Sequence, residues 1–370
     1  MLRKTWLEIN LDNFKKNCQY LINHTNKKLI AVIKANGYGL GDRYLAKCAI
    51  DAGCSMLAVS SIEEALIVRE VTDKDILILG YVDPKEADYL KKYDISCAVV
   101  SLSWVKELIN EDCKGVKVHL KVDTGMNRIG IKDKKELKEA YDLLVSHGVK
   151  VEGIFTHYAC SDDLNSNFTN EQFAKFKEAY DYLNVPFKYI HCDNSDAAID
   201  FKDDLTNAIR CGIAMLGYAS NDKDLLPVCS LYTQITNVKK VNKGETIGYG
   251  ATYRLDEDEI IATIPIGYAD GFIRKNQGRK VYVDGIYAPL VGRICMDQCM
   301  IKLPYMIENR TKVELFGKHI SLQLMAKELD TITYEILCNL SSRLTRIYIL
   351  DGKKCMECNS RLETINNGTF

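Results

Sequence analysis

The most reactive feature of the sequence is a lysine inside an apolar run. Lys34 lies near the end of KLIAVIKA and is followed by Asn-Gly-Tyr-Gly. Burial of an unpaired ammonium group is unfavourable and lowers the pKa of the amine, which suits such a lysine to Schiff-base chemistry. The structural alternative is a lysine at a strand end that pairs with a carboxylate, and this run alone does not decide between the two.

Four further apolar runs also end in polar side chains that can do chemistry. These are Lys121, Asp123 and Arg128 in KVDTGMNRIG; Thr156, His157 and Tyr158; His191 to Ser195 in HCDNS; and Arg210 in IRCGI. An arginine can grip a carboxylate with its forked donors. Each group alone could be a satisfied structural side chain, but five such strand ends together indicate one site.

A phosphate-binding cradle is the third element of the pattern. Ser195 and the backbone amides of Gly212 and Ile213 follow the last two runs of the first half of the chain. On a (β/α)₈ barrel, phosphate is usually bound after the seventh and eighth strands. A phosphate-bearing cofactor together with a lone lysine suggests pyridoxal phosphate (PLP).

The elements that must position these groups alternate regularly from residue 28 to about 217. Eight short apolar runs predict strands: KLIAVIKA, MLAVSS, ILILGYV, CAVVS, VKVHLKVD, VEGIFTHYA, FKYIHC and AIRCGIAML. Amphipathic helical segments such as GDRYLAKCAIDAG, SIEEALIVREV, PKEADYLKKYD, KKELKEAYDLLVSHG and NEQFAKFKEAYDYL separate them. This alternation predicts a parallel (β/α)₈ barrel, in which active sites form at the C-terminal strand ends; a doubly wound sheet has the same local pattern.

A second domain is predicted after about residue 225. Short strands punctuated by Gly and Pro replace the helical period: TQITNVKKV, EIIATIPIG, KVYVDGIYAPLVG and TKVELFG, with helical segments at SLQLMAKELD and TYEILCNLSSRL. We therefore expect a barrel over residues 1–225 and an all-β domain over 226–370. The first strand, TWLEINL, precedes the barrel units and could pair with the second domain instead.

The composition excludes several classes of protein. The 370 residues carry 49 basic and 50 acidic side chains, so no global field attracts nucleic acid or an anionic membrane, and a small-molecule partner is expected. There is no signal-peptide pattern, no apolar run near the length of a membrane-spanning helix, and the 14 cysteines are irregularly spaced, which favours reduced thiols in the cytoplasm. The single CMEC pair near the end is interpreted as incidental, so no metal site is expected.

IKANGYGLG resembles the lysine-bearing signature of the alanine racemase family. The resemblance continues in family order as KVDTGMNRIG, IFTHYA, HCDNSDAA, IRCGIAMLG, GYGATY, IPIGYADG and GRICMD, over about residues 4 to 350. It implies an enzyme that interconverts L- and D-alanine with PLP and supplies D-alanine for peptidoglycan. It further implies a head-to-tail homodimer with shared active sites.

The resemblance also implies a role for each matching residue. Lys34 resembles the lysine that carries the cofactor and acts as one base, and Tyr249 resembles the second base. The phosphate ligands would be Tyr38, Ser195, Gly212, Ile213 and Tyr334; Arg210 would meet the pyridine nitrogen, and His157 would link Arg210 to the tyrosine. Lys121 resembles a lysine that is often carbamylated and steadies Arg128, Met296 a contact of the substrate carboxylate, and Tyr268 and Arg274 entrance residues.

The sequence departs from the family pattern at a few positions. Leu40 stands where histidine is common, Asp196 where alanine is common, and Gly248 where serine is common, and SSRLTRIY lacks the usual proline.

Two bases on opposite faces of the α-carbon are the minimal equipment of a racemase. A free tyrosine has a pKa of about 10, so Tyr249 needs activation by neighbours such as His157 and Arg210. A guanidinium at the pyridine nitrogen leaves that nitrogen unprotonated, which weakens the electron sink and favours racemisation over side reactions.

Three alternatives to an alanine racemase remain at this stage. A serine or broad-specificity racemase would use the same machinery, although Tyr334 favours a small side chain. An amino-acid decarboxylase with a barrel is disfavoured by GRICMD and GYGATY, and a non-catalytic PLP-binding protein is disfavoured by the second domain.

Overall fold

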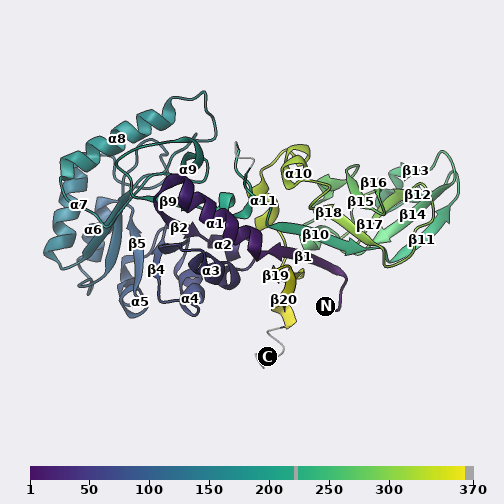
Figure 1. Ribbon diagram of the computed structural model, residues 1–370, viewed down its shortest axis with the longest axis horizontal. Coiled ribbons are helices and arrows are strands. Elements are labelled where there is room, and N and C mark those ends of the chain that lie inside the picture. The colour runs from purple at the N-terminus through teal and green to yellow at the C-terminus, as the bar shows by residue number, and fades with distance from the viewer. Residues whose placement is uncertain (221–223, 363–370) are drawn as a thin grey trace. The chain divides into compact units, whose positions relative to one another are not determined.

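The computed structural model describes residues 1–220 and 224–362, which divide into two compact units. Unit 2 comprises Asn13–Leu226, and unit 1 comprises Met1–Asp12 together with Pro227–Phe370. Figure 1 labels the elements of both units.

Unit 2 is a closed barrel of eight parallel strands, which confirms the predicted (β/α)₈ fold. The strands are β2 (Lys28–Val32), β3 (Met56–Val59), β4 (Asp75–Ile78), β5 (Ile95–Val99), β6 (Lys117–Lys121), β7 (Lys150–Phe155), β8 (Tyr189–His191) and β9 (Ala208–Cys211). The ring closes because β9 pairs with β2, with Ile30 opposite Arg210. A doubly wound sheet is thereby excluded.

Helices follow most of the barrel strands and cover them from outside (Figure 1). The helical segments of unit 2 are α1 (Leu11–Thr25), α2 (Lys34–Tyr38), α3 (Asp42–Asp51), α4 (Ile62–Arg69), η1 (Pro84–Glu86), α5 (Ala87–Lys92), α6 (Leu102–Leu108), α7 (Lys134–Ser146), α8 (Phe168–Leu183), α9 (Ala197–Asp200) and η2 (Ile213–Leu216). Side-chain caps fix several of their starts. Asp133, for example, accepts hydrogen bonds from the backbone N–H of Lys135 at 2.8 Å and of Glu136 at 3.0 Å.

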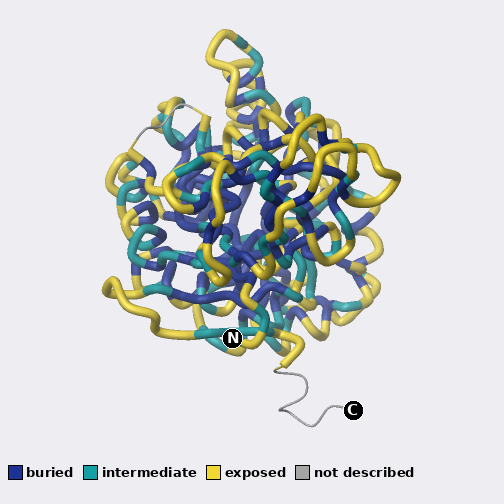
Figure 2. Tube along the Cα trace, turned by 90° about the vertical axis from the view of Figure 1, so that its right-hand side faces the viewer, coloured by how far each residue is buried: buried dark blue, intermediate teal, exposed yellow. Residues whose placement is uncertain are grey.

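The barrel strands are buried on both faces, as expected for parallel strands inside a ring of helices. Figure 2 shows buried segments in dark blue in the interior, while exposed residues, in yellow, gather in loops and turns. The prediction that AIRCGIAML is one strand was wrong, since β9 ends at Cys211 and residues 213–216 form the 3₁₀ helix η2. The change of direction follows Gly212, at the start of η2.

Unit 1 is built on a ten-stranded sheet in the order β11-β14-β17-β16-β15-β18-β10-β1-β19-β20. The strands are β1 (Thr5–Asn10), β10 (Cys229–Gln234), β11 (Asn237–Val241), β14 (Glu259–Ile264), β15 (Lys280–Val283), β16 (Ile286–Val291), β17 (Cys299–Leu303), β18 (Lys312–Phe316), β19 (Thr345–Leu350) and β20 (Lys353–Cys358). A two-stranded sheet, β12 (Thr246–Ile247) with β13 (Tyr253–Arg254), flanks the turn η3 (Tyr249–Ala251). Four helical segments complete the unit: η4 (Tyr268–Asp270), η5 (Arg274–Asn276), α10 (Leu322–Leu329) and α11 (Thr333–Cys338).

The first strand of the chain belongs to this second sheet. β1 is antiparallel to β10, with Leu7 opposite Leu231, and parallel to β19, with Trp6 opposite Thr345. TQITNVKKV, predicted as one strand, is two: β10 pairs with β1 and β18, whereas β11 pairs with β14. In the described part of the chain, no helix combines the length and hydrophobicity needed to cross a lipid bilayer.

Candidate active site

A strained turn follows Lys34 at the C-terminal end of β2. Ala35, Asn36, Gly37 and Tyr38 all have a left-handed backbone, with φ of 54°, 53°, 60° and 55°. Such a conformation costs an L-residue roughly 1 to 2 kcal/mol, so the three non-glycine positions must be held by their surroundings. Two hydrogen bonds hold this turn. The backbone N–H of Gly41 donates to the carbonyl of Asn36 at 2.8 Å, and Glu64 on α4 accepts the backbone N–H of Ala35 at 2.8 Å.

The second carboxylate oxygen of Glu64 accepts the backbone N–H of Ser60 at 2.7 Å. One side chain therefore ties the turn after β2 to the loop after β3. This contact fixes the direction in which the chain leaves Lys34.

Tyr38, Ser195 and Gly212 meet at the start of η2, after β2, β8 and β9. Ser195 Oγ accepts the backbone N–H of Gly212 at 3.3 Å and of Ala214 at 3.2 Å. A β-carbon at Gly212 would collide with the Tyr38 hydroxyl, so any larger residue would force the Tyr38 ring to move. All of these residues are buried. Buried hydroxyls beside backbone amides at a helix start form a cradle that suits a phosphate group.

Arg210 on β9 is buried inside the barrel and donates to neutral acceptors. Its Nη1 donates to His191 Nδ1 at 2.7 Å and to the His191 carbonyl at 2.8 Å. Its Nη2 donates to the carbonyls of Thr156 and Cys192 at 2.7 and 2.8 Å and lies 3.2 Å from His157 Nδ1. No carboxylate oxygen lies within 4 Å of this guanidinium in the described part of the chain, and its Nε has no hydrogen-bond partner there. The Nε–H is thus left for a ligand.

Lys121 at the end of β6 is buried, with 3% of its surface exposed. Its Nζ lies 4.9 Å from the centre of the Phe155 ring, and no described carboxylate pairs with it. Burial, with repulsion from Arg210 and Arg128, lowers the pKa of this amine to about 7. About half of the Lys121 amine is therefore neutral at pH 7.

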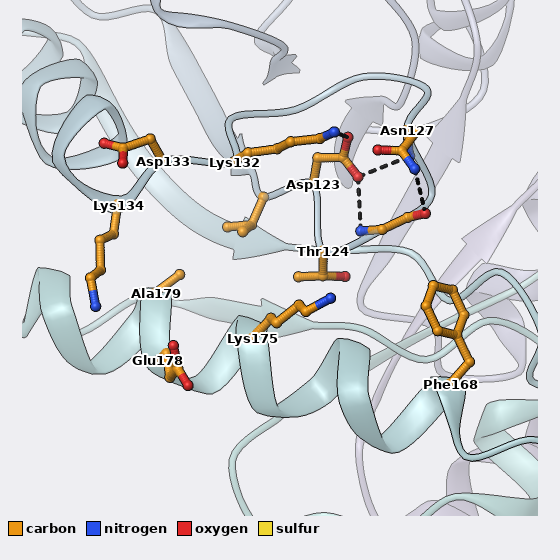
Figure 3. A pocket seen from close by; sticks show the side chains of 12 residues that line it. Asp123, Thr124, Asn127, Lys132, Asp133, Lys134, Phe168, Lys175, Glu178 and Ala179 are labelled. Atoms are coloured by element: carbon orange, nitrogen blue, oxygen red, sulfur yellow. Dashed lines mark hydrogen bonds and ion pairs between the residues drawn. The ribbon is translucent and has the colours of Figure 1, made fainter.

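The loop after β6 presents Arg128 to solvent. Asp123 organises this loop, because its Oδ1 accepts the backbone N–H of Gly125 at 3.1 Å and of Asn127 at 3.0 Å. Figure 3 shows these two hydrogen bonds and Lys132, whose Nζ lies 4.0 Å from the other oxygen of Asp123. The loop then returns to β6 through the Ile131 N–H, which donates to the Lys121 carbonyl at 2.9 Å.

The surroundings of His157 indicate that the basic side chains of unit 2 described above lie near one another. Burial lowers its pKa well below the usual value, and repulsion from Arg210, Lys121, Arg128 and Lys34 lowers it further. The imidazole is therefore neutral. Because Arg210 can only donate, His157 Nδ1 is an acceptor and its proton is on Nε2. Unit 2 thus brings together the predicted residues of the first half of the chain.

The predicted residues of unit 1 gather at two hollows. Tyr249 and Met296 line one of about 610 Å³, beside Cys295. Tyr249 also lines the other, of about 450 Å³, together with Tyr268 and Arg274. The backbone joins the two groups, because Tyr268 donates to the Cys295 carbonyl at 3.1 Å.

Most of these side chains are strongly exposed on unit 1. Tyr249 is 70% exposed and Met296 53%. Gly248, where the family commonly has serine, has φ 71° and ψ −170°, a conformation that is essentially restricted to glycine. Tyr334 lies half-buried on α11.

Sequence reasoning did not single out two residues that the structure places in this machinery. Glu64 holds the turn after Lys34, and His119 on β6 contacts His191 at 2.8 Å. The signal for His119 was available, because it is two residues before Lys121 and alternate residues of a strand share a face. Glu64 gave no signal, since a glutamate at the start of an amphipathic helix is ordinary.

Comparisons with known proteins agree with this geometry. The alanine racemase N-terminal domain matches residues 9–220, and the alanine racemase C-terminal domain matches residues 228–348. The chain belongs to the alanine racemase family. Within this family it is 41% identical to an alanine racemase of Anoxybacillus flavithermus, over 94% of this chain and 95% of that protein. It is 40% identical to an alanine racemase of Geobacillus stearothermophilus, over 96% of each.

Solved structures of family members have the same fold. The alanine racemase of Bacillus anthracis with bound L-Ala-P superposes with a TM-score of 0.93 at 36% identity, covering 99% of both chains. A histidine racemase from Leuconostoc mesenteroides superposes with a TM-score of 0.88 at 28% identity, covering 94% of this chain and 99% of that one. The fold is thus shared by racemases whose names give different substrates.

Proposed function

We propose that this chain is a cytosolic, PLP-dependent enzyme that interconverts L-alanine and D-alanine and so supplies D-alanine for peptidoglycan. The observation that carries the proposal is the joint presence of Lys34 and a cradle in which a β-carbon at position 212 would collide with Tyr38. Full-length relatives named alanine racemase support the choice of alanine.

The residues of unit 2 fit the cofactor. Lys34 would hold it covalently, and Tyr38, Ser195, Gly212 and Ile213, with Tyr334 from unit 1, would hold its phosphate. The free Nε–H of Arg210 would donate to its pyridine nitrogen. When bound, PLP withdraws electrons from the α-carbon of the amino acid and so acidifies the α-proton.

The remaining residues bind the substrate and move its proton. Arg128 and the backbone of Met296 would hold the α-carboxylate, so that the α-carbon is fixed between two bases. Lys34 and Tyr249 would remove the α-proton from one face and return a proton to the other. Because His157 is neutral with its proton on Nε2, it donates there and would stabilise the tyrosinate of Tyr249. Tyr268 and Arg274 would line the entrance.

Carbamylation of Lys121 fits its surroundings. A neutral amine is the form that combines with CO₂, and the carbamate product would carry a negative charge toward Arg128. Carbamylation would thereby orient the arginine that receives the substrate.

We further propose a head-to-tail homodimer in which Tyr249 of one protomer serves Lys34 of the other. The exposure of Tyr249, Tyr268 and Met296 supports this, since clustered exposed apolar side chains mark interaction surfaces.

The primary test measures chemistry and label position together. Purified protein with PLP should convert L-alanine to D-alanine, and borohydride reduction should fix the cofactor on Lys34, as read by peptide mass spectrometry. Lys34→Ala should show neither result, whereas Lys28→Ala, an exposed lysine on the preceding strand β2, should show both. Label on another lysine would refute the cofactor assignment.

Shared sites are tested by mixing two inactive variants. Lys34→Ala and Tyr249→Phe are unfolded and refolded together in equal amounts. About half of the dimers are then mixed, and each has one intact site, so roughly a quarter of wild-type activity should return. If both residues serve one site within a protomer, verified mixed dimers stay inactive.

A serine or broad-specificity racemase is the second candidate, favoured by the fold shared with a histidine racemase. Initial rates for single L-amino acids decide between the two. A higher kcat/KM for serine than for alanine would overturn the alanine assignment but leave racemisation intact.

A further inference from the structure

Two imidazoles connect β6 to Arg210 through the interior of the barrel. His119 on β6 and His191 on β8 are fully buried, and Arg210 on β9 is 4% exposed. His119 Nδ1 lies 2.8 Å from His191 Nε2, and His191 Nδ1 lies 2.7 Å from Arg210 Nη1. The three side chains form one continuous hydrogen-bonded row.

The arginine at the end of this row determines where every proton lies. A guanidinium nitrogen only donates, so His191 Nδ1 must be an unprotonated acceptor. His191 then carries its proton on Nε2, and that N–H donates to His119 Nδ1. It follows that the proton of His119 lies on Nε2. Burial supports the neutral state of both rings, because it lowers the pKa of His119 to about 3 and the pKa of His191 well below its usual value.

The outer end of the row has no partner. His119 Nε2 is buried and makes no hydrogen bond in the described part of the chain. A buried donor without an acceptor destabilises a fold, and a phenylalanine ring would fill the same space without that cost. The surroundings are shaped for a ring, since a β-carbon at Gly153 would lie 2.4 Å from His119 Nδ1 and Tyr189 stacks on the ring at 5.6 Å between centres. Packing alone therefore does not account for an imidazole at this position.

We propose that His119 is a positioning residue for Arg210 and acts through His191. By accepting the Nε2–H of His191, it holds His191 in the tautomer whose Nδ1 accepts from Arg210. Arg210 lies among carbonyls and imidazoles with no carboxylate within 4 Å in the described residues, so its orientation depends on such neutral acceptors. The function of Arg210 at the cofactor rests on the proposed function, whereas the proton arrangement does not.

The proton arrangement is tested on the unliganded protein by ¹⁵N NMR. The chain has six histidines, and single-residue variants assign their signals. His119 and His191 should both be neutral Nε2–H tautomers at pH 7, and the pKa of each should lie below the usual value of a histidine. A protonated His191, or a His191 proton on Nδ1, would overturn the proposal whether or not the protein racemises alanine.

The effect on Arg210 is tested with three variants. His119→Phe keeps the ring but removes the acceptor, and His119→Asn keeps an acceptor close to the position of Nδ1. Leu120→Val is the matched control, a buried change on the same strand whose side chain lies on the opposite face. With wild-type folding confirmed by circular dichroism, His119→Phe should lower kcat about tenfold with KM changed less than twofold, and should shift the absorbance of the bound cofactor.

His119→Asn should recover most of kcat and the wild-type absorbance, and Leu120→Val should change neither. An unchanged kcat in His119→Phe, or an equal loss in Leu120→Val, would refute the positioning role. If His119→Phe does not fold, the NMR tautomers and the His119→Asn variant test the positioning role instead. A folded His119→Asn that keeps the wild-type His191 tautomer but loses kcat would contradict that role.

Discussion

Lys121 should take up CO₂ selectively, because its surroundings keep its amine neutral. With a pKa of about 7, more than half of the amine is unprotonated at pH 7.4, against about one part in a thousand for an ordinary lysine. The reactive fraction is therefore about a thousandfold larger. In the reaction the amine nitrogen bonds to the carbon of CO₂, one proton is released, and an anionic carbamate results.

The sign of the pH dependence follows from the direction of the shift. The folded pKa of Lys121 is lowered, so the unfolded chain binds the proton more tightly between about pH 7 and pH 10.5 and stability rises with pH in that window. Protonation in the folded state costs up to roughly 4 to 5 kcal/mol. Carbamate occupancy should thus be lost as pH falls through about 7.

The assay is ¹³C NMR with labelled bicarbonate at about pH 8, combined with native mass spectrometry. One carbamate signal should appear per chain and be absent in Lys121→Arg. Lys188 is the internal control, because its hydrogen bond with Asp75 raises its pKa and it should stay unmodified. Removal of CO₂ should raise KM for alanine, because Arg128 would then lose the carbamate that orients it. No signal at saturating bicarbonate, or the same signal in Lys121→Arg, would refute the reasoning.

Three further predictions concern the cradle, the turn and the pocket. Gly212→Ala places a β-carbon 2.1 Å from Tyr38 Oη, about 1.3 Å inside ordinary contact, so PLP affinity should fall at least tenfold in a fluorescence titration; wild-type affinity would contradict the cradle. Glu64→Gln keeps one acceptor for two backbone N–H groups and should lower stability by about 1 to 2 kcal/mol in urea unfolding, an effect that an unchanged midpoint would exclude. Tyr334→Asn should raise the ratio of kcat/KM for serine to that for alanine about tenfold. A constant ratio would show that Tyr334 does not line the side-chain pocket.

The barrel could be predicted from sequence because parallel strands buried on both faces are continuous apolar runs. All eight were found, but several predicted runs extend past the end of the strand: KLIAVIKA continues beyond β2 into α2, ILILGYV beyond β4, VEGIFTHYA beyond β7, and AIRCGIAML beyond β9 into η2. The run AIRCGIAML gives no sign of a turn except Gly212, and the need for that glycine arises from the side chain of Tyr38, which is distant in sequence. Contacts of this kind cannot be read from a local pattern.

The β domain was harder to predict for the same reason. β17, β19 and β20 were missed. Cys299–Leu303 and Lys353–Cys358 contain Cys, Met, Lys and Glu in place of the usual β-branched residues, whereas Thr345–Leu350 has a typical strand composition and was overlooked. Residue types and strand ends sufficed to single out Lys34, Lys121 and Arg210, which the structure places at or directly after the ends of barrel strands. The tautomers around Arg210 and the lowered pKa of Lys121 depend on distances and burial, which only the structure supplies.

The position of β1 between β10 and β19 has a consequence for biosynthesis. Residues 5–10 are synthesised before the barrel, but their parallel partner lies about 340 positions later, with Trp6 opposite Thr345. The whole barrel is synthesised between β1 and β19 and can fold as a unit while one edge of β1 still has no partner strand. Closure of this sheet therefore follows synthesis of the barrel, and nascent chains stalled before residue 345 should expose that strand edge to chaperones.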